Sequence, residues 1–378
     1  MVDDTAPTHP YAANADYQRW HRGVTWVPPG ALDPMVNPRI RVTEQDRVAT
    51  IGSCFAQHLS RHLMRSGLNY YVAETAPPEL SPTDSADRQY GVYSARYGNV
   101  YTVAQAEQLI ARAFGNFAPV DHCWTHPSGG YADPFRPTVE PNGFSSVDAL
   151  EADRNSHLAA VRTMFEQSDI LVFTLGLTEA WRSRLDGAVY PTAPGVNAGT
   201  YQPDVHEFVN FDIDQVRAGL IRFCEAVRAI NPRVRVLLTV SPVPLVATYE
   251  PRHVLVSTTY SKSVLRVAAQ AALDQLPYVD YFPSYEIIST ASTSRNYYRD
   301  DLREVTDMGV AHAMRCFTHH FIHARPWSAS IDAAPAIAAG AGDSGADVIC
   351  DEATIAAAIE ASSRSTRARS SSWWREAS

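Results

Sequence analysis

Four short apolar runs recur along the chain, separated by segments of helical periodicity. The runs lie just before Gly52 and at residues 171–175, 234–240 and 278–282. Because the runs show no regular alternation with polar residues, they predict strands that are covered on both faces. Strands that alternate with helices across short links are typical of an α/β domain with a doubly wound, flavodoxin-like parallel sheet.

Apolar residues at three- and four-residue spacing predict the helices. This spacing begins directly after Gly52 with Phe55, Leu59 and Leu63, and the other helical segments are residues 147–167, 212–229 and 261–275. The change of period at Gly52 predicts a strand, a tight turn and a helix in immediate succession.

The composition changes at both ends of this pattern. Residues 1–45 are rich in Pro and aromatic residues and show little periodicity, which predicts an irregular N-terminal arm. Residues 46–323 hold the alternating elements and form the predicted domain. Residues 324–378 are dominated by Ala, Ser and Gly, so we predict a loosely packed C-terminal tail with at most one helix near 351–362.

Composition and charge narrow the class of protein. Of the 378 residues, 45% are hydrophobic and 19% charged, as in ordinary globular chains. A formal net charge of −9 argues against nucleic acid as a partner, because an acidic chain repels phosphate backbones. No apolar run approaches the roughly 20 residues that span a bilayer. Residues 1–17 also lack the apolar core of a signal peptide, so we predict a cytoplasmic protein without a transmembrane segment.

Cofactor motifs are absent from the sequence. The five cysteines are scattered and never form a Cys-x-x-Cys pair, which favours free thiols over a disulfide framework or a zinc cluster. His58 and His62 stand four residues apart on a predicted helix, a spacing that can ligate a metal, but no Glu or Cys completes the set nearby. The adjacent His319 and His320 are expected at the surface. No glycine-rich phosphate motif occurs, and we predict neither a metal nor a cofactor.

Polar residues follow three of the predicted strands, at the edge where open parallel sheets bind their ligands. These segments are residues 52–54, 176–179 and 241–244. A serine at a strand-to-helix turn exposes its hydroxyl beside the amides of the first helical turn, which makes Ser53 a candidate nucleophile. Two alternatives stay open: Ser53 simply caps the helix, or the neighbouring Cys54 thiolate is the nucleophile.

The long loops at residues 70–141 and 182–211 are suited to a binding surface. Arg136 could grip a carboxylate or phosphate, and the aromatic faces of Trp181 or Tyr93 could stack on a sugar ring, with Glu179 close by in sequence. We therefore predict Glu179, Trp181, Arg136 and Tyr93 as substrate-binding residues. Structural salt bridges and core packing are the alternative for each of them.

The segment Gly-Ser-Cys-Phe-Ala at residues 52–56 resembles the signature of the GSCFA family, whose members resemble the SGNH (GDSL-like) hydrolase superfamily. Five further segments also resemble the family's pattern, in the family's order, and together they extend the likeness over roughly residues 46–322. They are residues 97–102, 174–181, 239–244, 260–263 and 281–286. Several separated motifs in one order make the resemblance specific.

The resemblance implies a three-layer α/β/α fold with a serine nucleophile and an oxyanion hole. Carried over to this chain, the nucleophile is Ser53. The oxyanion donors are the Ser53 amide, Gly98 with Asn99 beside it, and the third block at residues 176–178. That block carries Thr178 where the superfamily usually has Asn, so its hydroxyl would donate from a shorter side chain.

The general base of the superfamily is a His three residues after an Asp, and this chain departs from that pattern. The matching stretch begins at Asp301 and has Glu304 in the position of the His. Glu304 could serve if burial raised its pKa, or His312 could supply the imidazole. The alternatives are a surface or capping role for His312, and a solvent-exposed ion pair of Glu304 with Arg303 or Arg299.

These residues predict a serine-dependent esterase or O-acyltransferase that acts through acyl-Ser53 on an acylated carbohydrate or a similar polar hydroxyl substrate. Its partners would be a small-molecule or glycan ester and, for a transfer reaction, an acyl donor. The alternative is a non-catalytic glycan-binding protein that keeps the SGNH-like fold, since the usual His is missing.

Overall fold

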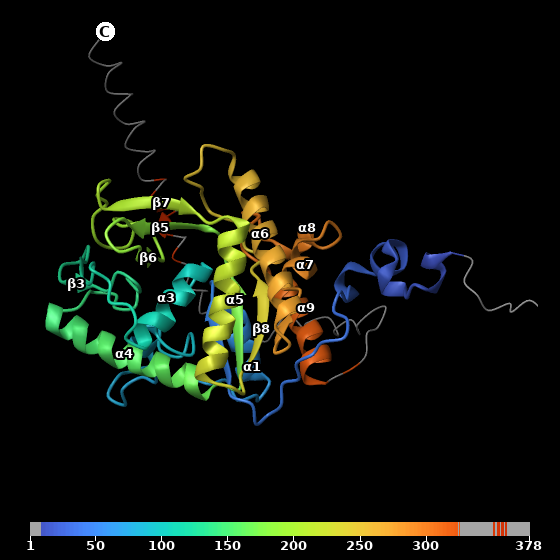
Figure 1. The fold of residues 1–378 in the computed structure, drawn as a ribbon, viewed down its shortest axis with the longest axis horizontal. Coiled ribbons are helices and arrows are strands. Elements are labelled where there is room, and N and C mark those ends of the chain that lie inside the picture. The colour runs from blue at the N-terminus through green and yellow to red at the C-terminus, as the bar shows by residue number, and fades with distance from the viewer. Residues whose placement is uncertain are drawn as a thin grey trace, which may run out of the picture. The chain divides into compact units, whose positions relative to one another are not determined.

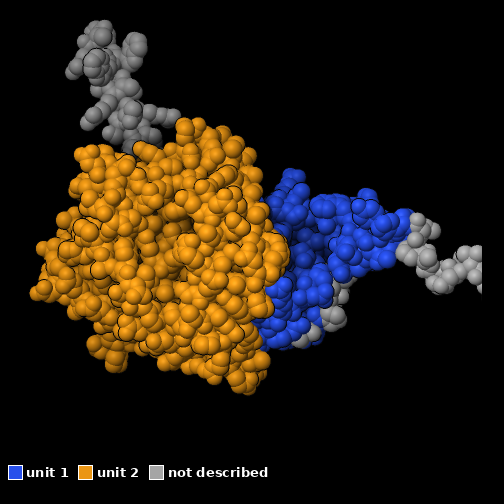
Figure 2. All heavy atoms as spheres, viewed as in Figure 1, with its two compact units in different colours: residues 1–42, 282–346 blue, residues 43–281, 347–378 orange. Residues whose placement is uncertain are grey.

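The computed structural model describes residues 9–323, Arg325 and six residues between 351 and 360. The chain divides into two compact units (Figure 2). Unit 1 comprises residues 1–42 and 282–346, and unit 2 comprises residues 43–281 and 347–378. The structure therefore groups 282–323, which the sequence assigns to the predicted domain, with the N-terminal arm.

The core of unit 2 is a parallel sheet of four strands. They are β1 (Val48–Gly52), β4 (Ile170–Leu175), β8 (Arg235–Val240) and β9 (Val279–Tyr281), in the order β1-β4-β8-β9. Every residue of β1 and β4 is buried, as strands covered on both faces require. The four strands confirm the α/β class and the parallel sheet predicted from the unbroken apolar runs.

The sheet continues past β1 as a single parallel bridge between Val48 and Tyr70. The Val48 amide donates to Asn69 at 3.0 Å, and its carbonyl accepts from Tyr71 at 2.9 Å. Because both backbone groups of Val48 face this segment, β4 pairs along the other edge of β1. Across the sheet, the neighbouring segments are the Tyr70 segment, β1, β4, β8 and β9. Numbered by their order in the chain, they follow one another as second, first, third, fourth and fifth.

Longer helices of unit 2 flank this sheet (Figure 1). They are α1 (Ala56–Arg65), α3 (Val103–Ala113), α4 (Val147–Gln167), α5 (Ile213–Ile230) and α6 (Val254–Gln275). α5 packs against α3, α4 and α6, whereas α1 packs on β1. Capping boxes begin α3 at Thr102 and α5 at Asp212; such caps stabilise a helix by about 1 kcal/mol.

The long loops of unit 2 contain short elements that the sequence did not reveal. Directly after the third block, β5 (Glu179–Ser183) pairs antiparallel with β6 (Val189–Tyr190) and β7 (His206–Asn210). The segment 70–141, predicted as one long loop, also holds the helix α3, together with α2 (Pro82–Asp87) and the hairpin of β2 (Trp124–Thr125) and β3 (Tyr131–Ala132). A small apolar cluster of Trp124, Ala132, Ala188, Tyr190 and Ala198 joins the two loops.

Unit 1 combines the N-terminal arm with the last described helices. The arm forms the turns η1 (Pro10–Ala13), η2 (Asp16–Gln18), η3 (His21–Thr25) and η4 (Pro29–Ala31). The later segment forms α7 (Ser284–Ser289), α8 (Ser294–Tyr297), α9 (Asp307–Phe317) and η5 (Thr318–Ile322). Backbone bonding ties the two together, because the Val42 amide donates to the Phe321 carbonyl at 2.8 Å.

Most of the predicted tail at 324–378 lies outside the described residues, and so does much of the helix predicted near 351–362. The six described residues between 351 and 360 are helical. Within the part of the chain that the structure describes, no helix is both long and apolar enough to cross a bilayer.

Candidate active site

The predicted strand-to-helix turn is present at Gly52 and Ser53. Gly52 has φ +138°, and a Cβ on it would lie 2.3 Å from the Thr174 carbonyl oxygen, so only glycine fits this position. The Ser53 amide donates to the same oxygen at 3.1 Å. The close approach of β1 to β4 therefore fixes the point at which the chain leaves the sheet.

The Ser53 hydroxyl was expected to be exposed at this turn, but in the structure it is buried. Ser53 is 2% exposed, and its Oγ has no hydrogen-bond partner among the described residues. Phe55 is the N-cap residue of α1, and no side chain caps this helix. The capping role considered from the sequence is therefore not the one Ser53 has.

The second block lies against this turn, because the Val100 amide donates to the Gly52 carbonyl at 2.8 Å. Gly98 takes the left-handed backbone conformation at φ +68°. Asn99 is buried and accepts a hydrogen bond from the Tyr93 hydroxyl. Tyr93 is 1% exposed, and burial raises its pKa well above the ordinary value. Its ring therefore forms part of the scaffold behind Asn99 rather than an open stacking surface.

A carboxylate from the far end of the chain meets the second block. Asn99 Nδ2 donates to Asp351 Oδ2 at 2.9 Å, and Thr138 Oγ1 donates to Asp351 Oδ1 at 3.1 Å. Burial raises the pKa of Asp351, and these two hydrogen bonds oppose the rise. The sequence held no local signal for this contact, because Asp351 stands in a segment dominated by Ala.

The third block packs directly on Ser53. A Cβ on Gly176 would lie 3.2 Å from Ser53 Cβ and 2.9 Å from the Tyr101 carbonyl oxygen. That oxygen accepts from the amides of Gly176 and Leu177 at 3.0 and 3.1 Å. Thus the structure brings the three predicted blocks, at residues 52–53, 98–101 and 176–178, into contact.

Thr178 is engaged by the protein at both of its donors. Its hydroxyl donates to Asn210 Oδ1 at 2.7 Å, and its amide donates to Ser261 Oγ at 3.0 Å. The Ser53 amide is likewise engaged by Thr174. In this structure, two of the predicted oxyanion donors therefore serve internal acceptors.

A pocket of about 290 Å³ opens beside the third block. Glu179 and Trp181 of β5 line it, together with Tyr101, Phe208 and Tyr249. Trp181 contacts the Tyr249 ring edge-on, with the centroids 5.0 Å apart. Burial raises the pKa of Glu179, whose carboxylate accepts from the Thr248 hydroxyl at 2.6 Å. None of the described residues lining this pocket is Lys, Arg or His.

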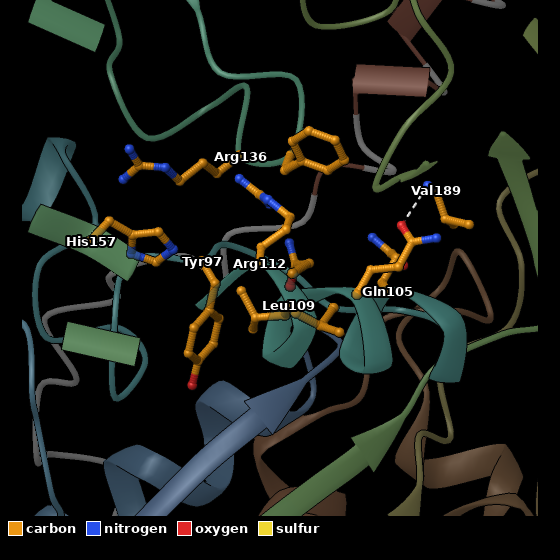
Figure 3. A pocket seen from close by; sticks show the side chains of 11 residues that line it. Tyr97, Gln105, Leu109, Arg112, Arg136, His157 and Val189 are labelled. Carbon is orange, nitrogen blue, oxygen red and sulfur yellow. Dashed lines mark hydrogen bonds between the residues drawn. The ribbon is translucent and has the colours of Figure 1, made fainter. Parts of the chain in front are cut away.

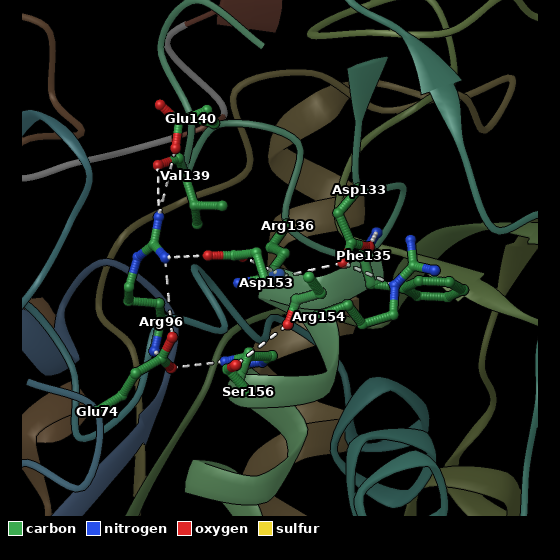
Figure 4. Close-up of polar contacts among 12 residues, drawn as sticks. Glu74, Arg96, Asp133, Phe135, Arg136, Val139, Glu140, Asp153, Arg154 and Ser156 are labelled. Atoms are coloured by element: carbon green, nitrogen blue, oxygen red, sulfur yellow. Dashed lines mark hydrogen bonds and ion pairs between the residues drawn. The ribbon is translucent and has the colours of Figure 1, made fainter. Parts of the chain in front are cut away.

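Arg136 belongs to a buried ion network (Figure 4). Its Nε donates to Asp133 Oδ2 at 3.1 Å, and its Nη2 contacts Asp153 at 2.5 Å. Burial would raise the pKa of Asp133, but the guanidinium groups of Arg136 and Arg112 hold it well below the usual range. This network secures the 133–137 turn to α4, which is the salt-bridge alternative considered for Arg136.

Beside this network lies a cavity of about 20 Å³ (Figure 3). Arg112, Arg136 and His157 line it, and Arg136 Nη1 has no hydrogen-bond partner among the described residues. The space suits about one water molecule, so Arg136 is not positioned to grip a larger acid there.

The predicted base residues belong to unit 1. Asp301 Oδ1 accepts from the amides of Arg303 and Glu304, both at 3.0 Å, and so shapes a turn. The Glu304 side chain is 65% exposed and pairs with Arg299 at 3.4 Å. This solvent-exposed pair is the alternative considered for Glu304 from the sequence.

His312 is buried in α9 and both of its ring nitrogens are engaged. Nε2 lies 2.7 Å from the Leu32 carbonyl oxygen, and Nδ1 lies 2.8 Å from the Tyr297 hydroxyl. Because a carbonyl can only accept, Nε2 carries the proton and Nδ1 accepts from Tyr297. Burial lowers the pKa of His312 to about 4, so its ring is neutral at pH 7.

One group of side chains in unit 1 could hold a metal ion. Asp33, His319 and His320 place one ligand atom each within 4.8 Å of one another. His320 Nε2 lies 2.8 Å from both carboxylate oxygens of Asp33, so the pair is also stable without an ion. His320 is 1% exposed; its expected place at the surface was therefore wrong, because η5 turns its ring inward onto Asp33.

A family model described as the GSCFA family matches residues 47–317, well over half of the chain. The chain belongs to the GSCFA family. No curated protein matches this GSCFA protein. Among solved structures, a Clostridium thermocellum family 3 carbohydrate esterase is similar at 11% identity with a TM-score of 0.31, covering 72% of this chain and 93% of that chain. So loose a likeness carries no argument about function.

Proposed function

We propose that this GSCFA protein is a serine-dependent esterase or O-acyltransferase with Ser53 as its nucleophile. Ser53 Oγ attacks the carbonyl carbon of an ester, the bond to the alcohol oxygen breaks, and the Ser53 proton passes through a base to the departing alcohol. Water or a sugar hydroxyl then attacks acyl-Ser53, and its proton returns to Oγ. The substrate is an acylated carbohydrate or a similar polar ester.

The unpartnered hydroxyl of Ser53 is the observation that carries this proposal. It is buried at the turn between β1 and α1, and no described residue bonds to it. A buried hydroxyl without a partner costs about 1–3 kcal/mol, and such groups in a native fold call for an explanation in function. Its neighbours are the two backbone segments that the superfamily resemblance assigns to the oxyanion hole.

Oxyanion stabilisation falls in our proposal mainly to Asn99 and the backbone of Gly98. The Asn99 carboxamide donates to Asp351 in this structure and would have to turn an N–H toward the substrate. Thr178 and the Ser53 amide would have to release Asn210 and Thr174 to take part. Donors aimed at a developing charge act strongly in a site that excludes water.

We further propose that the sheet of unit 2 has the flavodoxin-like arrangement of the SGNH hydrolases. The order second, first, third, fourth, fifth, with the Tyr70 bridge as the second segment, supports it. In that arrangement Ser53, at the carboxyl end of β1, stands beside the third segment across the sheet, β4, whose carboxyl end leads to Gly176.

The 290 Å³ pocket is the proposed substrate site. Aromatic faces such as that of Trp181 suit a sugar ring, and Glu179 can accept hydrogen bonds from sugar hydroxyls. The absence of Lys, Arg and His from its described lining favours a neutral ligand over an anionic one. Tyr101 and Leu177 line this pocket and are joined by a backbone hydrogen bond next to Gly176, which packs on Ser53, and this supports a common site.

Glu304 and His312 remain our proposed bases, and they differ in what each must give up. The exposed Glu304 carboxylate can exchange Arg299 for another partner at little cost. His312 would have to lose a hydrogen bond to Leu32 or Tyr297 in a buried setting.

Covalent labelling with an alkyl fluorophosphonate tests the nucleophile. Ser53 Oγ forms a bond to phosphorus, the phosphorus–fluorine bond breaks, fluoride leaves, and the serine proton passes to the base and then to solvent. We expect one label per chain, located at Ser53 by peptide mapping and absent in Ser53→Ala. Glu304→Gln should slow labelling by about 100-fold or more if Glu304 is the base.

Ser156→Ala is the matched control, because Ser156 is exposed on α4 and its hydroxyl bonds only to the Ala152 carbonyl in the same helix. This variant should label like the wild type. A label on another residue, or none from about pH 6 to about pH 10, would refute the esterase proposal.

The second candidate is a glycan-binding protein without catalysis. It is favoured by the engaged state of His312 and the solvent pairing of Glu304. This candidate predicts no labelling of Ser53, together with glycan binding that is lost in Trp181→Ala.

A further inference from the structure

Lys262 is the only lysine in the 378 residues, and the other 31 of the 32 basic residues are arginine. At an exposed position the two residues often serve equally, but a compact ammonium and a planar guanidinium differ in buried sites. This chain uses arginine at every other basic position. The single lysine therefore marks a position at which an arginine side chain would not serve.

That position lies inside unit 2, on the face of α6 that covers the third block. Lys262 is 2% exposed, and its Nζ donates to the Gly176 carbonyl oxygen at 2.6 Å. The preceding residue, Ser261, accepts from the Thr178 amide at 3.0 Å. Two successive side chains of α6 thus hold both ends of the segment 176–178.

Gly176 connects this lysine to Ser53. The Gly176 backbone lies so close to Ser53 that a Cβ on it would come within 3.2 Å of Ser53 Cβ. The Tyr101 carbonyl holds the other side of the same segment through the amides of Gly176 and Leu177. The Lys262 amino group therefore bonds to the residue that packs on the Ser53 side chain, in a buried setting where a charge would interact strongly.

We infer that Lys262 is a positioning residue of the Ser53 site, which fixes Gly176 against the nucleophile and supplies the positive charge that favours the anionic states formed at Ser53. This role rests on the proposed function. A buried charge is expensive to keep, and a neutral donor would satisfy the Gly176 carbonyl equally well. What a lysine adds to such a donor is its charge.

The test is the rate of fluorophosphonate labelling of Ser53 as a function of pH, in Lys262→Gln and Lys262→Arg. Gln keeps an N–H donor for Gly176 but carries no charge. We expect its labelling to be slower by about tenfold or more, with a pH profile shifted to higher pH, because the alkoxide forms less readily without the nearby cation. Lys262→Arg should keep the wild-type pH profile even where its larger group lowers the rate.

Arg266→Gln is the matched control. It removes a positive charge from the same helix, one turn further on, where Arg266 stacks on Tyr281 and bonds to Gln270. Its rate and pH profile should equal those of the wild type. Thermal unfolding of each variant identifies any that fails to fold, and Lys262→Met then provides a second neutral side chain.

The possible outcomes separate this inference from the proposed function. Labelling of folded Lys262→Gln at the wild-type rate and pH profile would overturn the role of Lys262 and leave Ser53 as nucleophile. If Lys262→Gln and Lys262→Arg slow the labelling of Ser53 equally and neither shifts its pH profile, Lys262 has only a structural role. Failure of the wild type to label at Ser53 would overturn the proposed function and this role with it.

Discussion

At the scale of single residues, two glycines decide how Ser53 is held. Gly52 allows the chain to turn where any Cβ would meet the Thr174 carbonyl, and Gly176 allows β4 to end against the Ser53 side chain. Neither glycine provides a chemical group. Gly52 permits a close approach to the Thr174 backbone and Gly176 one to Ser53 and Tyr101, and any side chain would crowd these contacts.

We expect Gly176→Ala to reduce the labelling rate of Ser53 by about tenfold or more while the protein still folds. The new Cβ would press on Tyr101 and Ser53 at 2.9 and 3.2 Å, and relief of this contact displaces the hydroxyl. Overpacking of this size costs about 1–3 kcal/mol. Labelling kinetics and urea unfolding measure the two effects separately.

Gly30→Ala is the control for this substitution, because the nearest atom to its new Cβ would be 3.9 Å away, an ordinary contact. It should leave the labelling rate unchanged. A Gly176→Ala variant that labels like the wild type would show that Ser53 is not held by this contact.

Sequence reasoning located Ser53 and the third block because each is a local motif beside a predicted strand, and the family resemblance added the second block. It did not find the partners of those blocks. Asp351 reaches Asn99 across 252 positions of sequence, and nothing near Asp351 announces the contact. Lys262 had a signal, its uniqueness in the chain, but only the bond to Gly176 gives that signal a meaning.

At the scale of elements, continuous apolar runs were reliable and short mixed segments were not. The four strands of the main sheet were predictable because burial on both faces leaves no polar alternation. β6 and β7 were not, since Val189–Tyr190 has two residues and His206–Asn210 has only partly buried side chains after its first residue. Their pairing with β5 depends on long-range contacts that a local pattern does not encode.

The buried histidine of α9 gives this element a dependence on pH. The folded pKa of His312, about 4, lies below the ordinary value of 6.5, so the unfolded chain binds the proton more tightly. Stability is fully present above about pH 6.5 and falls as the pH drops toward 4. The full shift corresponds to about 3 kcal/mol.

Urea unfolding of the wild type and His312→Gln at about pH 7 and about pH 4 measures this contribution. The wild type should lose about 3 kcal/mol more than the variant over this range. His323→Gln, at an exposed position, should behave like the wild type. An equal loss in wild type and His312→Gln would show that folding does not lower the pKa of His312.

At the scale of the whole chain, unit 2 is assembled from two separated stretches. The chain completes the sheet at β9, contributes its next segment to unit 1, and supplies unit 2 again from residue 347 onward. Asp351 joins the second block, and Ile355 lines the 290 Å³ pocket. A segment that the sequence predicted as a loosely packed tail thus contributes to the candidate site.

The Asp351 carboxyl sets how strongly this segment is held, and Asp351→Asn tests it. An asparagine can satisfy both partners, with its oxygen accepting from Asn99 and its N–H donating to the Thr138 hydroxyl, which can accept as well as donate. Because burial raises the pKa of Asp351, the wild-type contact weakens as the pH rises through that raised pKa, whereas the Asn contact does not.

Hydrogen exchange of residues 351–360 should therefore be slower in Asp351→Asn than in the wild type at about pH 7.5, with the difference vanishing near pH 4 or below. Asp351→Ala should exchange faster than both at every pH, since it removes the acceptor of the Asn99 and Thr138 donors, at a cost of about 1–3 kcal/mol. Faster exchange in Asp351→Asn than in the wild type at neutral pH would mean that the ionised carboxylate itself holds the segment. The negative charge of Asp351 would then be part of the Ser53 site.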